Sequence, residues 1–480
     1  MSQQQNFGAK IAAGGEQQGK SVPDRTTDGK GGGGGGLTSI MSLNNLKYQM
    51  PQNSACVVQR QHTRNYFDKN TYSGTETAVC FVNSGSAFID GCNSFLRLTL
   101  KITVDNTTGA PHTIGYAFHD HASGSLQQIG GTAANLIRTI SMYSRSGTEL
   151  ERIRRVNLLK YYVDAYANTE SNYNTSRTAQ GSRFYQSAVV GAGTNHVFTM
   201  NFCIPMREIS GLWRGPDDGT LMPAQLVSGL KVQIELENAK NSLVQYVTGV
   251  PTDALPAGVT MSYTLDDMTI VSDNVTLADV VLRQLNETSA KKGLEYYYCT
   301  YDTRTADATS TSFQSIESRK AVSRALQALL IIQPENSLIE KIGVDSFHSS
   351  ILETVLDQYQ SRVGSLWFPN QPVSDVTEAY MNALWAFDKL KFGGDSQIIR
   401  LDEYTGISRK TAGSIPQPAG LLGVTFERSN ILDISGIPMN NSRTLTQNVT
   451  LKASGDYHMT QFLKYVRLAR CFVNNIVLRE

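Results

Sequence analysis

Strict alternation of apolar and polar residues is the feature that most limits how this chain can fold. It runs through residues 95–104, 198–204 and 229–237. The apolar positions of the first segment are Leu96, Leu98, Leu100, Ile102 and Val104. A strand places successive side chains on opposite faces, so this period-2 pattern predicts strands with one buried face. Half-buried strands are typical of antiparallel sheets, because strands of parallel sheets read as continuous apolar runs.

More strands and a few helices are expected between these segments. Further strand candidates are residues 136–143, 261–271, 422–426, 448–451 and 466–478. Capping boxes at Thr148-Glu149-Leu150-Glu151 and Ser350-Ile351-Leu352-Glu353 predict two helix starts, the first helix running to about residue 166. Two more helices are expected over residues 277–286 and 375–390. Helices inserted between antiparallel strands predict a mainly β architecture.

One short motif occurs twice in the chain. Ile204-Pro205-Met206 recurs as Ile437-Pro438-Met439, and the separation of the two copies is close to half the folded length. We therefore expect two tandem copies of one β fold, each an antiparallel jelly roll of eight strands in two sheets. The expected division is a flexible Gly/Gln-rich N-terminal arm at 1–42, a first jelly roll at 43–276, a helical linker at 277–293 and a second jelly roll at 294–480.

Composition and charge argue against several classes of protein. Only 18 % of the residues are charged, below the roughly 25 % of ordinary soluble domains, which suggests surface that a partner covers. The net charge of +1 disfavours a nucleic-acid binder, which needs clustered Lys and Arg. The six cysteines are scattered without a C-x-x-C pair, as expected for a reducing compartment. No apolar run approaches a membrane span, so we expect a soluble protein made inside the cell.

Residues that could carry chemistry are few. His119-Asp120-His121 could hold a metal, but a third ligand at a recognisable spacing is missing and we interpret it as a surface loop. Asp266-Asp267 reads as a turn or surface pair, and Tyr296-Tyr297-Tyr298 as a half-buried strand at a sheet or interface, with a stacking platform as the alternative. Trp213, Trp367 and Trp385 are interpreted as core or subunit-contact residues. We therefore assign no catalytic, cofactor-binding or metal residues, and no cofactor.

Several segments resemble one protein family. Phe202-Cys203-Ile204-Pro205-Met206 leads through a loop into the alternating strand at 230–236, in the manner of double jelly-roll major capsid proteins. The segments at 137–162, 359–369 and 462–477 are similar to further parts of the same family. The chain most resembles the capsid proteins of Polinton-like viruses, virophages and adintoviruses, which have double-stranded DNA. The resemblance covers most of residues 45–480.

The resemblance implies a structural protein of the virion and not an enzyme. Pseudo-hexameric homotrimers would contact neighbouring trimers, and penton and minor capsid proteins, in an icosahedral shell assembled inside the host cell. No sequence-specific nucleic acid is expected. Three alternatives stay open: a tandem β-sandwich carbohydrate-binding protein, a tandem jelly-roll capsid protein of an RNA virus, and a penton or spike protein.

Overall fold

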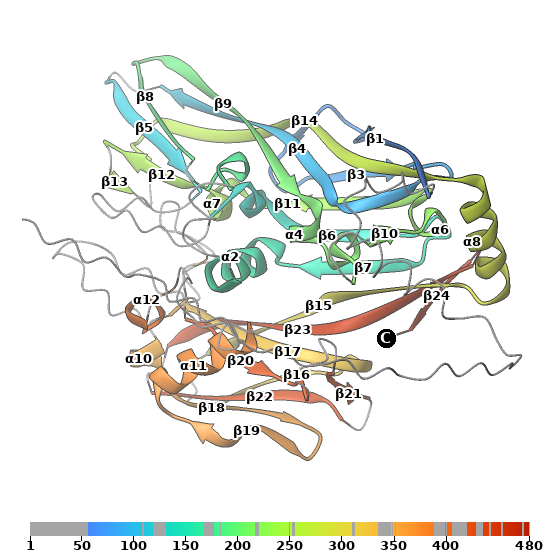
Figure 1. The fold of residues 1–480 in the computed structure, drawn as a ribbon. Helices are drawn as coiled ribbons and strands as arrows, with labels where there is room; N and C mark the ends of the chain where they lie inside the picture. Colours follow the sequence, from blue (N-terminus) through green and yellow to red (C-terminus); the bar gives the residue numbers. More distant parts are fainter. Residues whose placement is uncertain are drawn as a thin grey trace, which may run out of the picture. The chain divides into compact units, whose positions relative to one another are not determined.

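A computed structural model describes the chain from Cys56 to Arg479 with internal gaps (Figure 1). Outside the described residues lie 1–55, 108–109, 119–130, 168–176, 183, 217–219, 249, 252–254, 310–312, 335–346, 348, 351, 388–398, 400, 406–419, 429–434, 441–442, 453–454, 473–474 and 480. The predicted arm at 1–42 and the His119-Asp120-His121 cluster therefore fall outside the described residues.

The first half of the chain forms two antiparallel sheets. One has the order β1 (Val57–Tyr66), β14 (Val259–Leu277), β4 (Phe88–Asn106) and β9 (Thr194–Pro205), with β2 (Thr71–Ser73) and β10 (Leu221–Met222) attached. The other has the order β3 (Thr77–Val82), β11 (Leu230–Leu236), β6 (Ile137–Tyr143) and β7 (Glu149–Arg154). Counting these eight main strands along the chain, the sheets read 1-8-3-6 and 2-7-4-5. This order is a jelly roll.

The second half repeats the order with different residues. One sheet runs β15 (Leu294–Thr309), β23 (Asp456–Cys471), β17 (Val322–Pro334) and β20 (Leu422–Thr425), with β21 (Ile437–Met439) and β24 (Ile476–Arg479) attached. The other runs β16 (Phe313–Ser318), β22 (Leu445–Leu451), β18 (Leu356–Val363) and β19 (Leu366–Val373). The expected mainly β fold of two tandem jelly rolls is therefore confirmed.

The repeated Ile-Pro-Met motif marks equivalent places in the two rolls. Ile204, at the end of β9, pairs with Leu96 on β4, and Ile437 on β21 pairs with Ala325 on β17. β4 and β17 are each the third main strand of their roll, so both copies of the motif border the same strand position. The tripeptide match thus reports a structural repeat.

A smaller sheet extends the first roll, and short helices join the strands. The sheet has the order β13 (Val250–Pro251), β12 (Val244–Val247), β5 (His112–Ala117) and β8 (Tyr185–Val190). The helices are η1 (Ala133–Leu136), α2 (Val156–Ala167), η2 (Thr178–Gln180), α4 (Met206–Ile209), α5 (Gly211–Arg214), α6 (Ala224–Val227), α7 (Ala239–Ser242), α8 (Asp279–Lys291), α10 (Leu352–Val355), α11 (Val376–Ala386) and α12 (Leu401–Thr405). Among the described residues, none of these helices is long and apolar enough to cross a membrane.

The apolar residues of the alternating segments line the inner faces of the rolls. The five apolar positions predicted for the 95–104 strand are all buried in β4, while Arg97 and Lys101 between them are only half-buried. Burying a side chain of this kind contributes about 1.5–3 kcal/mol. A strand shifted by one residue would expose the whole apolar set, so burial also fixes the pairing register.

Some predicted elements are wrong in detail. Thr148-Glu149-Leu150-Glu151 opens no helix: residues 149–154 form strand β7, and α2 begins at Val156 after a left-handed Arg155 (φ 55°). The Ser350 box leads to a single turn, α10, and then to β18. The predicted strand at 466–478 is the hairpin of β23 and β24. The helices near 277 and 375 are confirmed as α8 and α11, the latter capped by Asp375, whose Oδ1 accepts from the Thr377 N–H at 3.0 Å.

Candidate assembly interface

The two rolls of one chain meet where an edge strand of the first faces the first main strand of the second. β7 is the outermost strand of its sheet, and β15 packs against it and against the short helix α5 (Figure 1). β15 begins soon after α8, the helix that connects the rolls. Edge strand β7 is therefore covered by the chain itself, which removes an edge that could pair with other molecules.

Side chains of the second roll donate hydrogen bonds to backbone carbonyls of the first. The hydroxyls of Tyr298 and Tyr296 donate to the carbonyl oxygens of Leu150 and Leu212, the latter at 2.9 Å. Arg467 on β23 also donates to the Leu150 carbonyl. Tyr296 and Tyr298 are buried while Tyr297 between them is half-buried, as expected for a strand at an interface. The tyrosine run is thus part of the roll-to-roll contact.

The backbones of the two rolls approach each other closely at Gly211. A Cβ atom on this glycine would lie 1.7 Å from the carbonyl oxygen of Cys299 on β15. Only a residue without a side chain fits there, because ordinary contacts with a Cβ begin above about 3 Å. Gly91 faces a similar limit, since its Cβ would lie 1.9 Å from the Trp213 carbonyl oxygen. Glycine therefore sets how closely the second roll sits on the first.

Glu151 binds the turn that carries this glycine. Its carboxylate, fully buried on β7, accepts hydrogen bonds from the Ser210 hydroxyl, from the Gly211 N–H at 3.0 Å and from the Leu212 N–H at 3.3 Å. These are N–H groups of the first turn of α5, which no intrahelical carbonyl can satisfy. Burial raises the pKa of the Glu151 carboxyl above its ordinary value, although these hydrogen bonds act in the opposite direction. The glutamate predicted to cap a helix after Thr148 thus binds the start of a different helix.

A buried ion cluster fixes the short helix α4, which precedes the Gly211 turn. Lys160 on α2 lies 2.7 Å from Glu208 on α4 and 2.5 Å from Asp164. Arg177 contacts both carboxylates, so two cations face two anions. Buried charges are tolerated only when they are paired in this way. The cluster fixes α4 against α2, and α4 precedes the Gly211 turn directly.

The strands that correspond to β7 and β15 in the other roll, β19 and β1, are exposed. β19 occupies in the second roll the edge position that β7 has in the first, and Leu366 and Trp367 on it are 48 % and 38 % exposed. β1 corresponds to β15, yet eight of its ten residues are exposed, among them Val58 at 69 % and Tyr66 at 68 %. Figure 1 shows β1 and β19 on opposite sides of the two rolls. Within the described residues, one pair of such strands is therefore buried, and the matching strands of a second pair, β1 and β19, are exposed.

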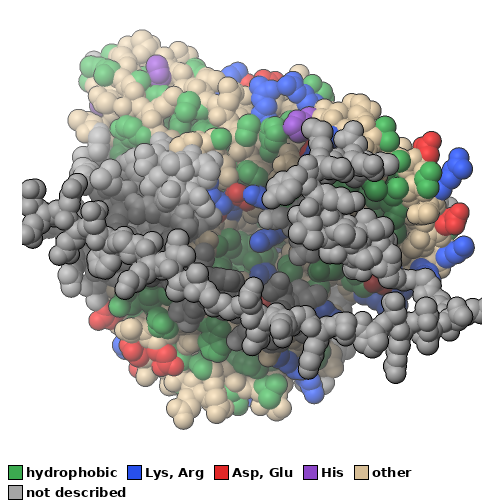
Figure 2. All heavy atoms as spheres, in the orientation of Figure 1, with side chains coloured by type: hydrophobic (Ala, Val, Ile, Leu, Met, Phe, Trp, Pro, Cys, Tyr) green, Lys and Arg blue, Asp and Glu red, His purple; other side chains and the backbone are tan. Residues whose placement is uncertain are grey.

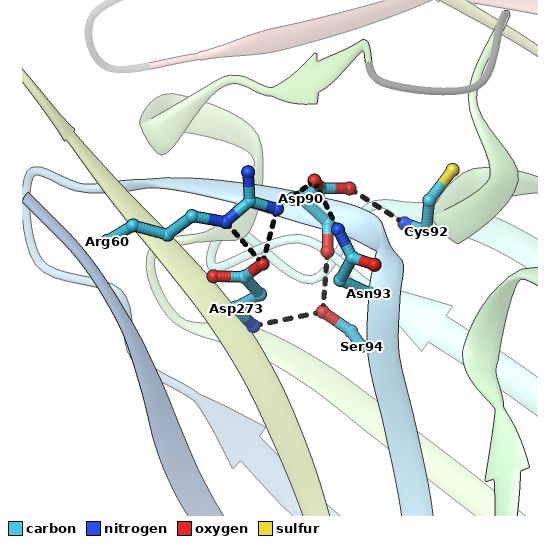
Figure 3. A network of polar contacts seen from close by, with 6 residues as sticks. All are labelled: Arg60, Asp90, Cys92, Asn93, Ser94 and Asp273. Carbon is cyan, nitrogen blue, oxygen red and sulfur yellow. Dashed lines mark hydrogen bonds and ion pairs between the residues drawn. The ribbon is translucent and has the colours of Figure 1, made fainter. Parts of the chain in front are cut away.

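An ion network keeps the exposed strand β1 in register (Figure 3). The Arg60 guanidinium on β1 contacts Asp273 on β14, with Nε to Oδ2 at 2.8 Å, and Asp90 on β4. Both carboxylates are buried, and Asp90 also accepts from the Cys92 N–H and the Asn93 amide. Because one guanidinium bridges two strands deeper in the sheet, β1 is held firmly although most of it faces solvent.

The remaining candidates from the sequence fall into ordinary structural places. Trp213 is buried in the core of the first roll, whereas Trp385 on α11 is 50 % exposed. Asp266 forms an ion pair with Lys101, and Asp267 sits at a bulge with φ 52°. Among the described residues, no group of His, Cys, Asp and Glu is arranged to hold a metal. On the face in Figure 2, basic side chains lie in small groups, several of them beside acidic ones.

Sequence reasoning missed Glu151, Ser210 and Gly211 as interface residues. Nothing within residues 148–154 distinguishes a helix cap from a strand whose glutamate binds a turn far along the chain. The one local signal was the spacing of Glu149 and Glu151, which period 2 places on one face of a strand. In the structure only Glu151 is buried, because a bulge lies between the pairs of Met142 and Tyr143.

Comparison with solved structures finds the same fold. The Faustovirus major capsid protein superposes with a TM-score of 0.56 at 10 % identity, over 93 % of this chain and 94 % of that chain. A chain of the Sputnik virophage gives 0.56 at 10 % identity over 90 % of both chains. The mavirus major capsid protein gives 0.50 at 10 % identity over 96 % of both. No family model and no curated protein matches the sequence. At such low identity the likeness concerns the fold, and this chain has the double jelly-roll fold of viral major capsid proteins.

Proposed function

We propose that this chain is the major capsid protein of a double-stranded DNA virus and assembles as pseudo-hexameric homotrimers into an icosahedral shell. The observation that carries the proposal is the pair of free strands, β1 and β19, which match the buried pair β15 and β7 by topology. In the proposed trimer, β19 of one copy packs against β1 of the next. The shared fold of capsid proteins from three viruses supports the same role.

Closure of a ring follows from the way the rolls would repeat. The contact between β7 and β15 relates one roll to the next within the chain. Repeating a head-to-tail contact of this kind gives either an open filament or a closed ring, depending on the rotation. Three chains with two rolls each would close as six similar units. The proposed contact includes exposed apolar and aromatic side chains, Val58 and Tyr66 on β1 and Leu366 and Trp367 on β19, beside polar residues of β1. Apolar anchors with polar surroundings suit a permanent interface burying about 2,000 Å² or more.

Other parts of the assignment follow from the same proposal. The protein would be located in the virion capsid, be assembled inside the host cell, and contact penton and minor capsid proteins at the rims of its trimers. We propose residues 43–276 and 294–480 as the two shell-forming domains, joined by the linker at 277–293. The near-neutral charge supports close packing of identical subunits, since little electrostatic repulsion opposes it.

The test is the solution mass of the purified chain and of two paired variants. We expect a trimer of about 158 kDa, three times the chain mass of 52.6 kDa. Trp367→Glu should give monomers, because a charge would be buried in the proposed contact. Phe313→Glu is the matched control: Phe313 is an exposed aromatic residue on β16, the opposite edge of the same sheet. It should leave the trimer intact.

A second pair of variants tests the other half of the contact. Val58→Glu on β1 should dissociate the trimer, whereas Val189→Glu on β8, where the valine is equally exposed, should not. Circular dichroism checks that all four variants keep their strands. A wild-type chain that stays monomeric at micromolar concentration would refute the capsomer. A monomer that binds glycans on an array would favour the carbohydrate-binding alternative.

A further inference from the structure

A pocket of about 610 Å³ lies at one end of the second roll, where strand β18 turns into β19 and strand β22 begins. These strands are neighbours in one sheet (Figure 1). A volume between about 300 and 1,000 Å³ is typical of ligand sites. The described residues that line the pocket are Arg362, Gly364, Ser365, Arg443, Thr444, Thr446 and Asn448. Two arginines therefore share one pocket with hydroxyls and an amide, and no acidic residue is among its described lining.

The two arginines carry positive charge that no carboxylate of the described chain binds. Neither the Arg362 guanidinium nor the Arg443 guanidinium forms an ion pair within the described residues, and both side chains are exposed. Two guanidiniums in one pocket repel each other, and an anion bound between them removes this repulsion. Each also presents N–H donors in a planar fork that matches the spacing of phosphate oxygens. The charge and the donors both favour an anionic ligand.

The acidic residue closest in the sheet register is already neutralised. Glu317 on β16 pairs with Thr446, and Thr446 pairs with Arg362, so two strand spacings of about 5 Å separate the glutamate from the arginine. Arg319 forms an ion pair with Glu317, with 3.0 Å from Nη2 to Oε2, and the Thr444 hydroxyl also donates to this carboxylate. The local charge balance is therefore three arginines to one glutamate.

Contacts within the chain hold both arginine side chains in place. The Arg362 Nε donates to the Gly364 carbonyl oxygen at 2.6 Å, and the guanidinium lies 5.3 Å from the centre of the Trp367 ring. This leaves the terminal nitrogens of Arg362 for a ligand. The Arg443 stem packs on Gly364, where a Cβ would lie 3.0 Å from Arg443 Cγ. Donors that are held before binding lose less conformational entropy when a ligand arrives.

The first roll has the same arginine–glycine contact with the two positions exchanged. Arg145 lies in the turn between β6 and β7, which correspond to β18 and β19 as the fourth and fifth main strands. Its stem packs on Gly229, directly before β11, where a Cβ would lie 3.2 Å from Arg145 Cγ. In the second roll Gly364 is in the turn and Arg443 precedes β22. Both rolls thus place an arginine at this end, and the second roll adds Arg362.

We propose that the pocket containing Arg362 and Arg443 binds a phosphate group. The two guanidiniums bind its charged oxygens, and the Ser365 and Thr446 hydroxyls and the Asn448 amide supply further hydrogen bonds. A phosphate group offers more oxygens and more charge than a carboxylate, so it satisfies two arginines at once. Free phosphate and the phosphodiester backbone of a nucleic acid share this group. The site lies within one chain and does not depend on the proposed trimer.

Phosphorus NMR relaxation of inorganic phosphate, titrated with the full-length chain at low salt, is the first test. We expect Arg362→Gln and Arg443→Gln each to weaken binding by about 10-fold or more, because each removes charge-assisted hydrogen bonds. Arg283→Gln is the matched control, since it removes an exposed arginine of α8 that does not line the pocket. It should leave the affinity unchanged. Circular dichroism checks that all three variants keep their strands.

Fluorescence anisotropy with a labelled oligothymidylate identifies the source of the phosphate. If the oligonucleotide binds, removing both pocket arginines should lower the slope of log affinity against log salt by about 1.4, at about 0.7 for each phosphate contact. Binding of inorganic phosphate alone assigns the pocket to free phosphate. Binding of neither probe, or an equal loss in Arg283→Gln and the two pocket variants, would overturn the proposal. The solution mass of the same samples keeps this result separate from that for the trimer.

Discussion

Replacing Gly211 by alanine tests directly whether the two rolls are held together as described. The new Cβ would lie 1.7 Å from the Cys299 carbonyl oxygen, 2.8 Å from its carbonyl carbon and 3.0 Å from Glu151 Oε1. An ordinary contact needs about 3.2 Å, so the two backbones must separate by about 1.5 Å. β15 is paired with β23 along its whole length, from Leu294 to Thr309, and cannot yield locally. The second roll must therefore retreat as a body.

The expected cost follows from what that retreat breaks. Overpacking costs about 1–3 kcal/mol, and each weakened hydrogen bond to Leu150 or Leu212 adds about 0.5–1.5 kcal/mol. We expect Gly211→Ala to lower the free energy of unfolding by about 3–5 kcal/mol. The sign of this change in the free energy of unfolding distinguishes the two possibilities. Gly211 does not have a left-handed backbone conformation, so an alanine with open space around its Cβ would stabilise the chain by about 0.4–1 kcal/mol.

Thermal unfolding and hydrogen exchange measure this effect. Gly211→Ala should lower Tm by roughly 5 °C or more and increase exchange in β7 and β15, the strands on either side of the contact. Gly191→Ala is the matched control, since its Cβ would meet only the flexible side chain of Thr194, at 3.2 Å. A Gly211→Ala protein with a Tm equal to or above that of the wild type would show that the rolls do not approach as closely as this.

Three further results are expected. Burial raises the pKa of the Glu151 carboxyl, so the folded chain binds this proton more tightly than the unfolded chain does. Ionised Glu151 therefore destabilises the fold at pH values above its raised pKa, and this effect is lost below the ordinary pKa of a glutamate. Glu151→Gln should remove this part of the pH dependence of the free energy of unfolding, measured in urea between pH 4 and 8. Arg60→Ala should destabilise the chain by about 1–3 kcal/mol, since it leaves two buried aspartates facing each other, and Arg60→Ala combined with an Asp273→Asn change should recover part of the loss. Burial raises the pKa of the Cys80 thiol to about 12, so iodoacetamide should modify exposed Cys56 in the native chain and leave Cys80 unmodified until urea is added.

Local pattern predicted the strands because it reports which face each strand buries. The alternation at 95–104, 198–204 and 229–237 corresponds to β4, β9 and β11, and both copies of the Ile-Pro-Met repeat pair with the third main strand of their roll. The helix predicted to start at Thr148 was wrong, because a glutamate can bind the N–H groups at the start of a helix that lies elsewhere in the chain, as Glu151 does with α5. Which tryptophan is buried also depends on tertiary neighbours: Trp213 lies under β15, while Trp367 lies on an edge strand.

The different chemistry of the two contacts has a physical reason. α8 tethers β15 to β7, and a short tether gives an effective concentration of roughly millimolar. A contact between separate chains at micromolar concentration lacks this factor of about 1,000, which corresponds to about 4 kcal/mol. The tethered contact can therefore rely on tyrosine hydroxyls bound to carbonyls and on a close backbone approach at Gly211. The contact proposed between chains would need more apolar surface, and β19 exposes Leu366 and Trp367 that would supply it. If the proposed ring forms, its last contact closes between chains already joined, so the third interface gains the same advantage that α8 gives within one chain.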